Sequence, residues 1–169
     1  MSVSVEMEKV KFQVEYPVNS SKGVLFNMFS TPSGLAEWFC DDVNITKDIH
    51  TFIWDGSEES ARIISKKRED FIKFRWLEDE DSGIASYFEF RIKIDDLTGD
   101  TAIVITDFAE EDEIDDSKEL WSAQVDRLKQ VLGAWWLDSE HIRPHEFAIA
   151  ICKVHLTFDA MPLLDAHFF

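Results

Sequence analysis

Near the front of the chain stands the sequence Thr31-Pro32-Ser33-Gly34-Leu35-Ala36-Glu37-Trp38-Phe39. The threonine is a residue type that caps helices, and the proline suits the first helical position, where its missing N–H needs no partner. Leu35, Trp38 and Phe39 then recur at helical spacing and share one face. The stretch therefore predicts a two-turn helix that carries a Trp-Phe pair into the core.

Strands and turns surround this helix. Residues 10–17 alternate apolar and polar side chains, and a short helix capped by Asn19 is predicted to follow them. From 41 to 108 the chain reads as a series of strands with short connections, which predicts an antiparallel meander. Within that series, Glu78–Gly83 is predicted to be an acidic loop.

A long amphipathic helix is predicted to close the meander. Asp116 is the expected cap, with Glu119 three residues later as its reciprocal partner. The apolar side chains of one face then recur at steps of four and three residues. They are Trp121, Val125, Leu128, Leu132 and Trp135.

The order of these segments resembles the helix-grip fold of the START and Bet v 1-like (pollen-allergen) superfamily, known as SRPBCC. It is closest to the bacterial branch related to the activator of the heat-shock protein 90 ATPase, the AHSA type. The resemblance covers roughly residues 7–136. It is carried by Tyr16-Pro17-Val18, Ser33–Phe39, Phe52-Ile53-Trp54, Phe71–Trp76, Tyr87–Phe90, Leu97–Thr101, Ile105–Phe108 and Trp121–Gly133.

The resemblance implies an α+β domain in which a curved antiparallel sheet of about six to seven strands grips the long C-terminal helix. Two short helices lie near the N-terminus, and many members have a cavity between sheet and helix. Members bind lipids, hormones or other apolar ligands, some are polyketide cyclases or aromatases, and some act on chaperones. The resemblance therefore specifies the fold more closely than the activity.

The amino-acid composition limits the kinds of partner that the protein is expected to bind. The 169 residues include 34 acidic and 17 basic ones, giving a formal net charge of -17, with 45% hydrophobic and 13% aromatic residues. This field repels phosphate backbones and anionic membrane surfaces, so neither nucleic acid nor a membrane is an expected partner. With no signal peptide or membrane-spanning run predicted, a cytoplasmic protein is expected.

Alternation predicts which side chains face the gripped helix and would line a cavity. The candidate ligand-binding residues are Tyr16, Trp38, Phe39, Trp54, Phe74, Trp76, Phe88, Phe90, Ile105, Trp121, Val125 and Leu128. Aromatic and apolar walls with few polar groups are typical of small-molecule pockets. The alternative is that these large rings fill the space between sheet and helix, and the sequence leaves both readings open.

No catalytic residue, metal site or cofactor is predicted. The inward set offers only the hydroxyl of Tyr16, and Asp107 is expected at an exposed strand end, although its register would let it reach the cavity mouth. His141 and His145 are separated by a proline, and His155 and His167 are isolated, so all four are expected to be ordinary histidines.

The chain is divided into a START-like domain, residues 1–138, and an extension, residues 139–169. From His141 onward the charged residues are only Arg143, Glu146, Lys153, Asp159 and Asp165. The apolar side chains of this segment would be costly to leave in water. The extension is therefore expected to pack either on its own domain or on a second subunit, which would make a homodimer. Of the two cysteines, Cys40 and Cys152, both are expected to be buried thiols.

Three functions follow from these features. The first is non-enzymatic binding of a small hydrophobic or aromatic ligand between the sheet and the long helix. The second is a protein–protein interaction module, either of co-chaperone type or a homodimerising scaffold, with a filled core. The third is a polyketide cyclase-like enzyme, which would require a buried acid–base pair that the alternation pattern does not predict.

Overall fold

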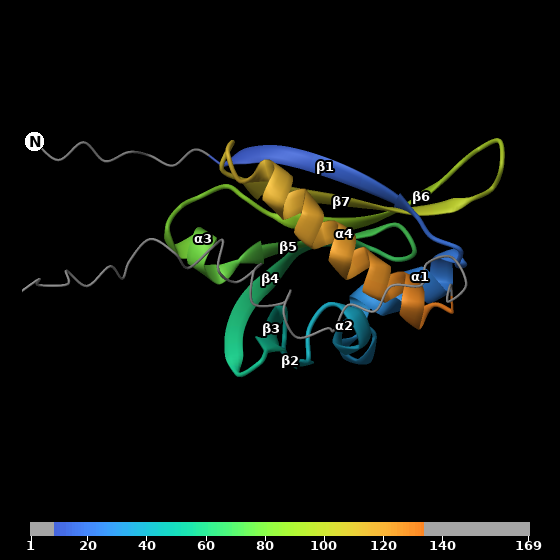
Figure 1. Ribbon diagram of the computed structural model, residues 1–169. Coiled ribbons are helices and arrows are strands. Elements are labelled where there is room, and N and C mark those ends of the chain that lie inside the picture. The colour runs from blue at the N-terminus through green and yellow to red at the C-terminus, as the bar shows by residue number, and fades with distance from the viewer. Residues whose placement is uncertain (1–8, 134–169) are drawn as a thin grey trace, which may run out of the picture.

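The structure is a computed structural model, and it describes residues 9–133. It contains a curved sheet, a long helix and three short helices in the described part of the chain (Figure 1). The strands are β1 Val10–Pro17, β2 Asp42–Thr46, β3 Ile49–Trp54, β4 Ser57–Lys67, β5 Phe71–Trp76, β6 Phe88–Ile94 and β7 Thr101–Ala109. The helices are α1 Lys22–Ser30, α2 Pro32–Trp38, α3 Leu77–Asp81 and α4 Ile114–Val131.

All seven strands belong to one sheet in the order β1-β7-β6-β5-β4-β3-β2. Every neighbouring pair is antiparallel, and the meander from β2 to β7 is closed by β1, which pairs with β7 from Val10 opposite Ala109 to Pro17 opposite Ala102. This confirms the predicted antiparallel sheet of six to seven strands.

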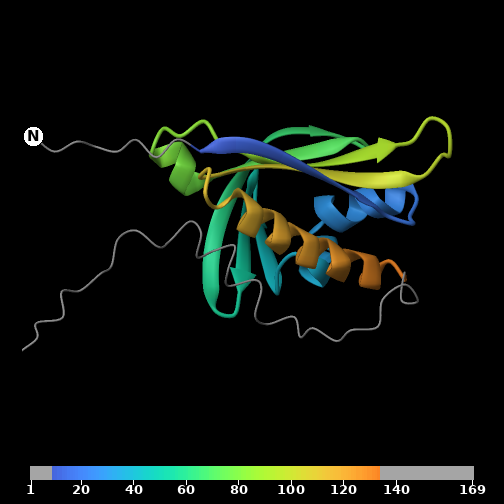
Figure 2. The same ribbon diagram turned by 45° about the horizontal axis from the view of Figure 1, so that its top comes forward.

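The sheet curves around α4, which lies across its concave side (Figures 1 and 2). Helices α1 and α2 lie against the same side near the C-terminal end of α4, and α3 lies beyond its N-terminal end. This arrangement is the helix-grip fold that the sequence predicted, with two short helices between the first and second strands.

The predicted Trp-Phe helix is confirmed as α2. The Thr31 hydroxyl accepts a hydrogen bond from the Gly34 amide at 3.1 Å, and Pro32 occupies the first turn. A Cβ at Gly34 would collide with the Asn27 carbonyl oxygen and would lie 2.7 Å from the Met28 Cα. Glycine is therefore required at this position, because it lets α2 pack directly against the end of α1.

The two other predicted caps are wrong by a few residues. Helix α1 is capped by the Ser21 side chain, which accepts from the Val24 amide, rather than by Asn19.

Helix α4 begins at Ile114, two residues before Asp116. Asp116 instead lies in the first turn, where the partial positive charge of the helix N-terminus favours a carboxylate without a capping hydrogen bond. The helix ends before Gly133, whose φ of +86° is the left-handed conformation typical of a C-terminal glycine.

The predicted acidic loop 78–83 is also wrong in part, because its first residues form α3. Three acidic residues occupy the first turn of this helix, where the helix dipole stabilises them. Asp79 is only 4% exposed and forms an ion pair with Lys9 at 2.8 Å. This long-range pair ties the acidic turn to the residue just before β1, which a loop prediction from local charge alone cannot anticipate.

The convex face of the sheet carries charged side chains that pair with one another. Glu89 lies at its centre, with Lys73 at 3.2 Å on one side and Arg91 at 2.9 Å on the other. Lys73 also lies over the ring of Tyr87, 4.1 Å from its centroid. These charges pair with one another on the face of the sheet that no helix of the described residues covers.

Candidate functional site

Phe39 lies between the sheet and α4, at the end of the grip where α2 packs. It is fully buried, and its ring lies parallel to that of Trp121 on α4, with centroids 6.0 Å apart and an interplanar angle of 4°. On the sheet side it contacts Phe52 edge-on at 5.1 Å and Trp54 at 5.5 Å. Helix α2 therefore delivers the residue that joins the sheet to the gripped helix.

A second group of stacked rings extends this cluster across the sheet. Phe74 and Phe88 stack with centroids 4.9 Å apart, and Trp76 stacks on Phe88 at 4.7 Å. Phe90 lies between the two groups, since it contacts Phe88 at 5.7 Å and Trp121 at 5.7 Å. The aromatic side chains are thus one continuous cluster rather than the separate walls of an open chamber.

Three buried indoles have their N–H groups satisfied inside the protein. Trp38 donates to the Met28 carbonyl at 2.9 Å, and Trp54 donates to the Phe39 carbonyl at 2.7 Å. Trp121 donates to the Asp107 carboxylate at 2.9 Å. These bonds fix the orientations of the rings, because rotating a ring away would leave a buried N–H group without a hydrogen-bond partner, which is costly.

The structure brings the sequence-predicted ligand-binding residues together. All are buried except Tyr16, which is half-buried and donates from its hydroxyl to the Lys118 carbonyl on α4 at 3.2 Å. Burial is the main reason that the pKa of Tyr16 is raised. Trp76 alone among them lines the pocket described next. The others are Trp38, Phe39, Trp54, Phe74, Phe88, Phe90, Ile105, Trp121, Val125 and Leu128, and they form the core of the grip.

A pocket of about 210 Å³ opens at the edge of this core, where β4 and β5 separate. Pairing between these strands ends at Ala61 opposite Trp76, because the chain then turns into α3. Strand β4 continues beside β3 as far as Ser57. The two strands therefore diverge as a fork, and the fork leaves the pocket. Its lining residues are Glu58, Glu59, Ser60, Trp76, Leu77, Glu78 and Asp79.

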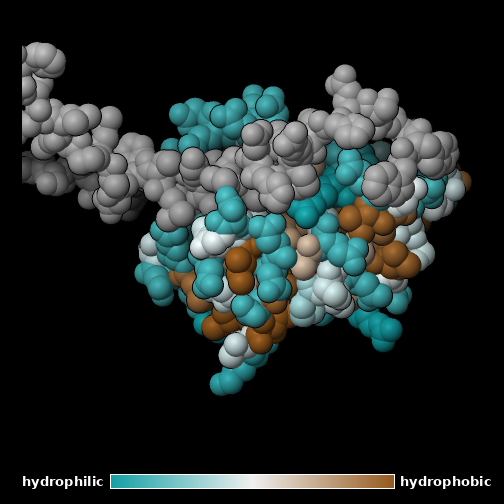
Figure 3. Space-filling view, turned by 60° about the horizontal axis from the view of Figure 1, so that its bottom comes forward, coloured by the Kyte–Doolittle hydropathy of each residue, from teal (hydrophilic) through white to brown (hydrophobic). Residues whose placement is uncertain are grey.

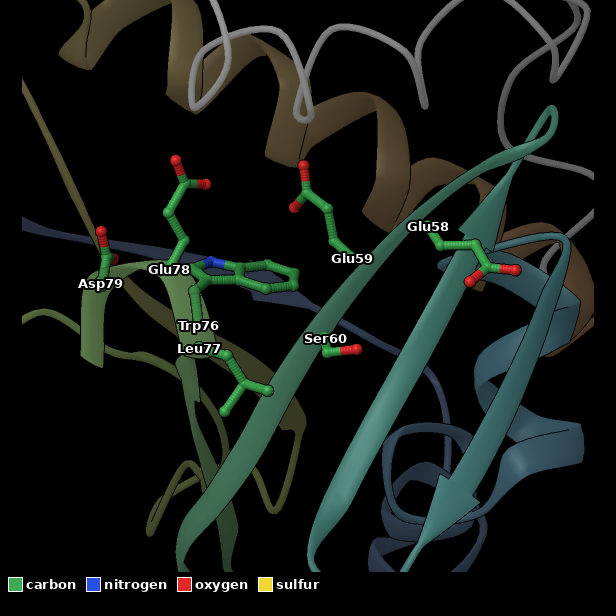
Figure 4. A pocket seen from close by; sticks show the side chains of 7 residues that line it. All are labelled: Glu58, Glu59, Ser60, Trp76, Leu77, Glu78 and Asp79. Atoms are coloured by element: carbon green, nitrogen blue, oxygen red, sulfur yellow. The ribbon is translucent and has the colours of Figure 1, made fainter. Parts of the chain in front are cut away.

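The pocket combines one aromatic wall with an acidic rim (Figure 4). The Trp76 indole lies between Glu78 on α3 and Glu59 on β4, and both carboxylates extend on the same side of the ring. Trp76 is 7% exposed and stacks on Phe88 behind it, so its ring is held in place by the core. The arrangement offers a small ring-shaped ligand a rigid surface to stack on.

Two carboxylates near this end of the grip, from buried Asp79 and half-buried Asp107, are held by structural contacts. Asp79 receives hydrogen bonds from Lys9 Nζ and the Ser86 hydroxyl. Asp107 accepts from the Trp121 indole and the Phe108 amide, at 2.9 and 2.8 Å. Burial raises the pKa of Asp107 to about 6, against the lowering effect of these two bonds. Both carboxylates already hold partners within the protein, as structural groups do.

Asp107 also corrects the expectation of an exposed strand end. Its side chain points toward α4 in register with Ile103 and Ile105, which was the less favoured reading of the sequence. The favoured reading failed because Asp107 stands next to an acidic run, and local charge says nothing about the indole that reaches it from α4.

His50 is an inward-facing residue that the sequence reasoning missed. It is 3% exposed, its ring contacts Phe74 edge-on at 5.2 Å, and its Nδ1 is buried without a hydrogen-bond partner. Burial and, to a smaller extent, the nearby Lys66 charge lower the pKa of His50, which favours the neutral form of the imidazole. The signal was available, since His50, Phe52 and Trp54 alternate along β3.

Glu59, Glu78 and Asp79 of the pocket were likewise missed. Glu59 lies in register with inward-facing Ala61, so alternation could have placed it at the end of the concave face. The α3 residues gave no such signal, because their position depends on where β5 ends.

Other predicted residues add little chemistry. Cys40 is fully buried as predicted, and burial raises the pKa of its thiol to about 12. Within residues 9–133, no group of three or more His, Cys, Asp or Glu side chains is placed to hold a metal ion. His141, His145, His155, His167 and Cys152 lie outside the described residues, as does the extension 139–169.

The fold and the sequence define the family. Residues 6–134 match the START-like superfamily domain, and the chain belongs to this superfamily. No curated protein matches it. None of the helices within residues 9–133 is both long and apolar enough to cross a bilayer.

Solved structures support the same assignment. BfR322 from Bacteroides fragilis is 40% identical over 81% of this chain and 99% of its own, with a TM-score of 0.55. The Aha1 dimer from Colwellia psychrerythraea shares the fold at 15% identity, covering 73% of this chain and 96% of that one, with a TM-score of 0.62. DynU16, from the dynemicin biosynthetic locus, shares it at 16% identity and a TM-score of 0.59, over 72% of this chain and 46% of that one.

Proposed function

We propose that the protein is a non-enzymatic START-like domain that binds one small apolar or aromatic ligand at the fork between β4 and β5. The observation that carries this proposal is the pocket beside Trp76, which adjoins the aromatic core and contains one of the predicted ligand-binding residues. Phe88 and Phe90 provide a rigid support behind Trp76, because Trp76 stacks on Phe88 and Phe88 packs edge-on against Phe90.

The size of the pocket limits the ligand. An apolar cavity of about 150 Å³ is large enough for benzene. At about 210 Å³ the fork pocket therefore suits a single ring system with a short substituent, such as a small indole. A long lipid chain would have to displace rings such as Phe39 from the core.

A titration tests this proposal with a variant that fills the pocket. We expect small 3-substituted indoles to bind the full-length protein in isothermal titration calorimetry. Leu77→Trp places a second indole in the pocket and should weaken binding at least about tenfold, a loss of about 1.4 kcal/mol. Leu97→Trp is the matched control, since Leu97 is 95% exposed in the β6–β7 turn. Absence of binding by every indole, or equal binding by both variants, would refute the proposal.

A second candidate function, a protein–protein interaction module, is supported by the filled aromatic core. Large apolar side chains are also exposed on several elements, and Figure 3 shows brown apolar surface interrupted by teal polar groups on one face. The exposed residues are Val10, Val24, Ile45, Ile64, Leu97 and Val131. The apolar extension 139–169 in the sequence adds a candidate segment for a homodimer.

Light scattering separates this candidate from the first. A homodimer predicts a mass of twice 19.6 kDa in solution and a return to the monomer mass when residues 141–169 are deleted. A full-length protein that stays at 19.6 kDa across concentrations would contradict it.

The cyclase-like alternative has less support. A cyclase would need a carboxylate that can act as an acid or a base. The candidates are Asp79 and Asp107, and both already accept hydrogen bonds within the protein, Asp79 from Lys9 and Ser86 and Asp107 from Trp121. A cytoplasmic location remains part of the proposal and is supported by the free thiol of Cys40, since thiols stay reduced in that compartment.

A further inference from the structure

The charge of the fork pocket points to the chemical class of its ligand, an inference that rests on the ligand-binding function proposed above. Four of its seven lining residues are acidic, namely Glu58, Glu59, Glu78 and Asp79, and none is basic. Asp79 is compensated by Lys9. Among the described residues, no basic side chain forms a salt bridge with Glu58 or Glu78. The pocket therefore presents net negative charge to whatever enters it.

The field of the whole chain acts in the same direction. The net charge of -17 attracts cations from solution and repels anions, and a recessed site concentrates this effect. An anionic ligand, such as a fatty acid or an aromatic carboxylate, would have to lose water beside like charges, and no residue that lines the pocket is basic. Such a ligand is disfavoured on entry and again in the bound state.

The aromatic wall adds a specific attraction for a cation. A positive group over the face of an indole is attracted by the negative charge of the ring faces, most strongly for tryptophan among the aromatic residues. Trp76 is held between Glu59 and Glu78 (Figure 4), so one ammonium group can lie near the ring and the rim carboxylates together. The stack of Trp76 on Phe88 keeps this surface fixed before the ligand arrives.

We infer that the ligand is an organic cation, namely a ring-sized aromatic or aliphatic group that carries an amine on a short arm. The ring stacks beside Trp76 and Leu77, and the ammonium faces Glu59 and Glu78, which lie on either side of the indole in Figure 4. This assignment distinguishes the site from a general apolar cavity, because it requires a positive charge on the ligand as well as an apolar body.

Three indoles of nearly equal size test the charge requirement. Tryptamine is a cation at pH 7, 3-ethylindole is neutral, and indole-3-propionate is an anion. In calorimetric titrations of the full-length protein at low salt, tryptamine should bind at least tenfold more tightly than 3-ethylindole, and indole-3-propionate at least tenfold more weakly. Added salt should weaken tryptamine binding and leave 3-ethylindole binding unchanged, since only the former depends on screened charge.

A double variant locates the charge effect. Glu59→Gln with Glu78→Gln keeps the size of the rim and should reduce tryptamine affinity about tenfold, with no change for 3-ethylindole. The matched control is Glu37→Gln with Glu119→Gln, which removes two exposed carboxylates outside the pocket and should leave both affinities as they are.

The outcomes separate this inference from the proposed function. Equal binding of tryptamine and 3-ethylindole, both abolished by Leu77→Trp, would overturn the cation requirement and leave ligand binding intact. An equal loss in the rim and control variants would also overturn it, because the effect would then come from net charge. Failure of all three indoles would refute the proposed function itself.

Discussion

The two ends of the grip differ in how completely the chain fills them. At one end α2 inserts Phe39 between the sheet and α4, and rings surround it on both sides. At the other end β5 stops at Trp76, α3 turns away, and a pocket remains. An aromatic inner face therefore does not by itself make a cavity. The ends of the strands decide where space is left.

The largest effect is expected from Phe39→Ala, at the filled end. Removing a fully buried phenyl ring leaves a cavity between Trp121 and Phe52 and should lower the free energy of unfolding by about 3–5 kcal/mol. Denaturant unfolding followed by circular dichroism measures this change. Leu97→Ala, at an exposed turn, is the control. A loss no greater than that of the control would mean that Phe39 does not join the sheet to the helix.

Lys9→Met should have the next largest effect, because it leaves the Asp79 charge buried beside the open end. We expect a loss of about 2–4 kcal/mol in the free energy of unfolding, measured in the same way. Lys93→Met breaks an exposed ion pair with Glu15 on the convex face and should change little. Equal effects of the two variants would show that the Lys9 pair is no more than a surface contact.

The helix pair at the filled end can be tested with two glycines. Gly34→Ala forces a methyl group into the Asn27 carbonyl and should cost about 1–3 kcal/mol of stability. Gly23→Ala has room, with its nearest neighbour 3.8 Å away, and should stabilise α1 by up to about 1 kcal/mol. Thermal melting of both variants measures this contrast. Shifts of the same sign would contradict the close approach of α1 and α2.

Asp107 should make the stability of the protein depend on pH. Its pKa is raised to about 6, above the ordinary value of 3.8, so the folded state binds its proton more tightly than the unfolded chain. Stability from this group is therefore fully present below about pH 4 and is lost as the pH rises through about 6, by about 1–3 kcal/mol. Asp107→Asn should remove this slope.

The indole N–H resonance of Trp121 reports the same titration, because Asp107 accepts its hydrogen bond. It should move with a midpoint near pH 6 in the wild-type protein and stay constant in Asp107→Asn. A resonance that stays constant in both proteins would contradict a pKa of about 6 for Asp107.

Much of the fold could be predicted from local patterns. Thr31 and Pro32 set the start of α2, and alternation placed Phe74, Phe88 and Phe90 on the inner face. These features depend only on spacing along the chain, which the sequence displays directly.

The pocket could not be predicted in the same way. Its position depends on β4 extending past the point where β5 ends, which is a relation between two strands rather than a pattern within one. The acidic residues of α3 read locally as a loop, and only the partner Lys9, seventy residues away, places Asp79 at the pocket wall. Long-range pairing of this kind leaves no periodic signal.

The position at which a neutral ring binds is the measurement that bears most directly on the fork pocket. In ¹⁵N–¹H NMR spectra, 3-ethylindole should shift the indole N–H of Trp76 and the amides of Glu58–Ser60 and Leu77, and leave the amides of Phe39 and Leu128 in place. Shifts centred on Phe39, Trp121 and Leu128 would contradict the account, because they would show that the aromatic core opens and that the ligand lies within the grip.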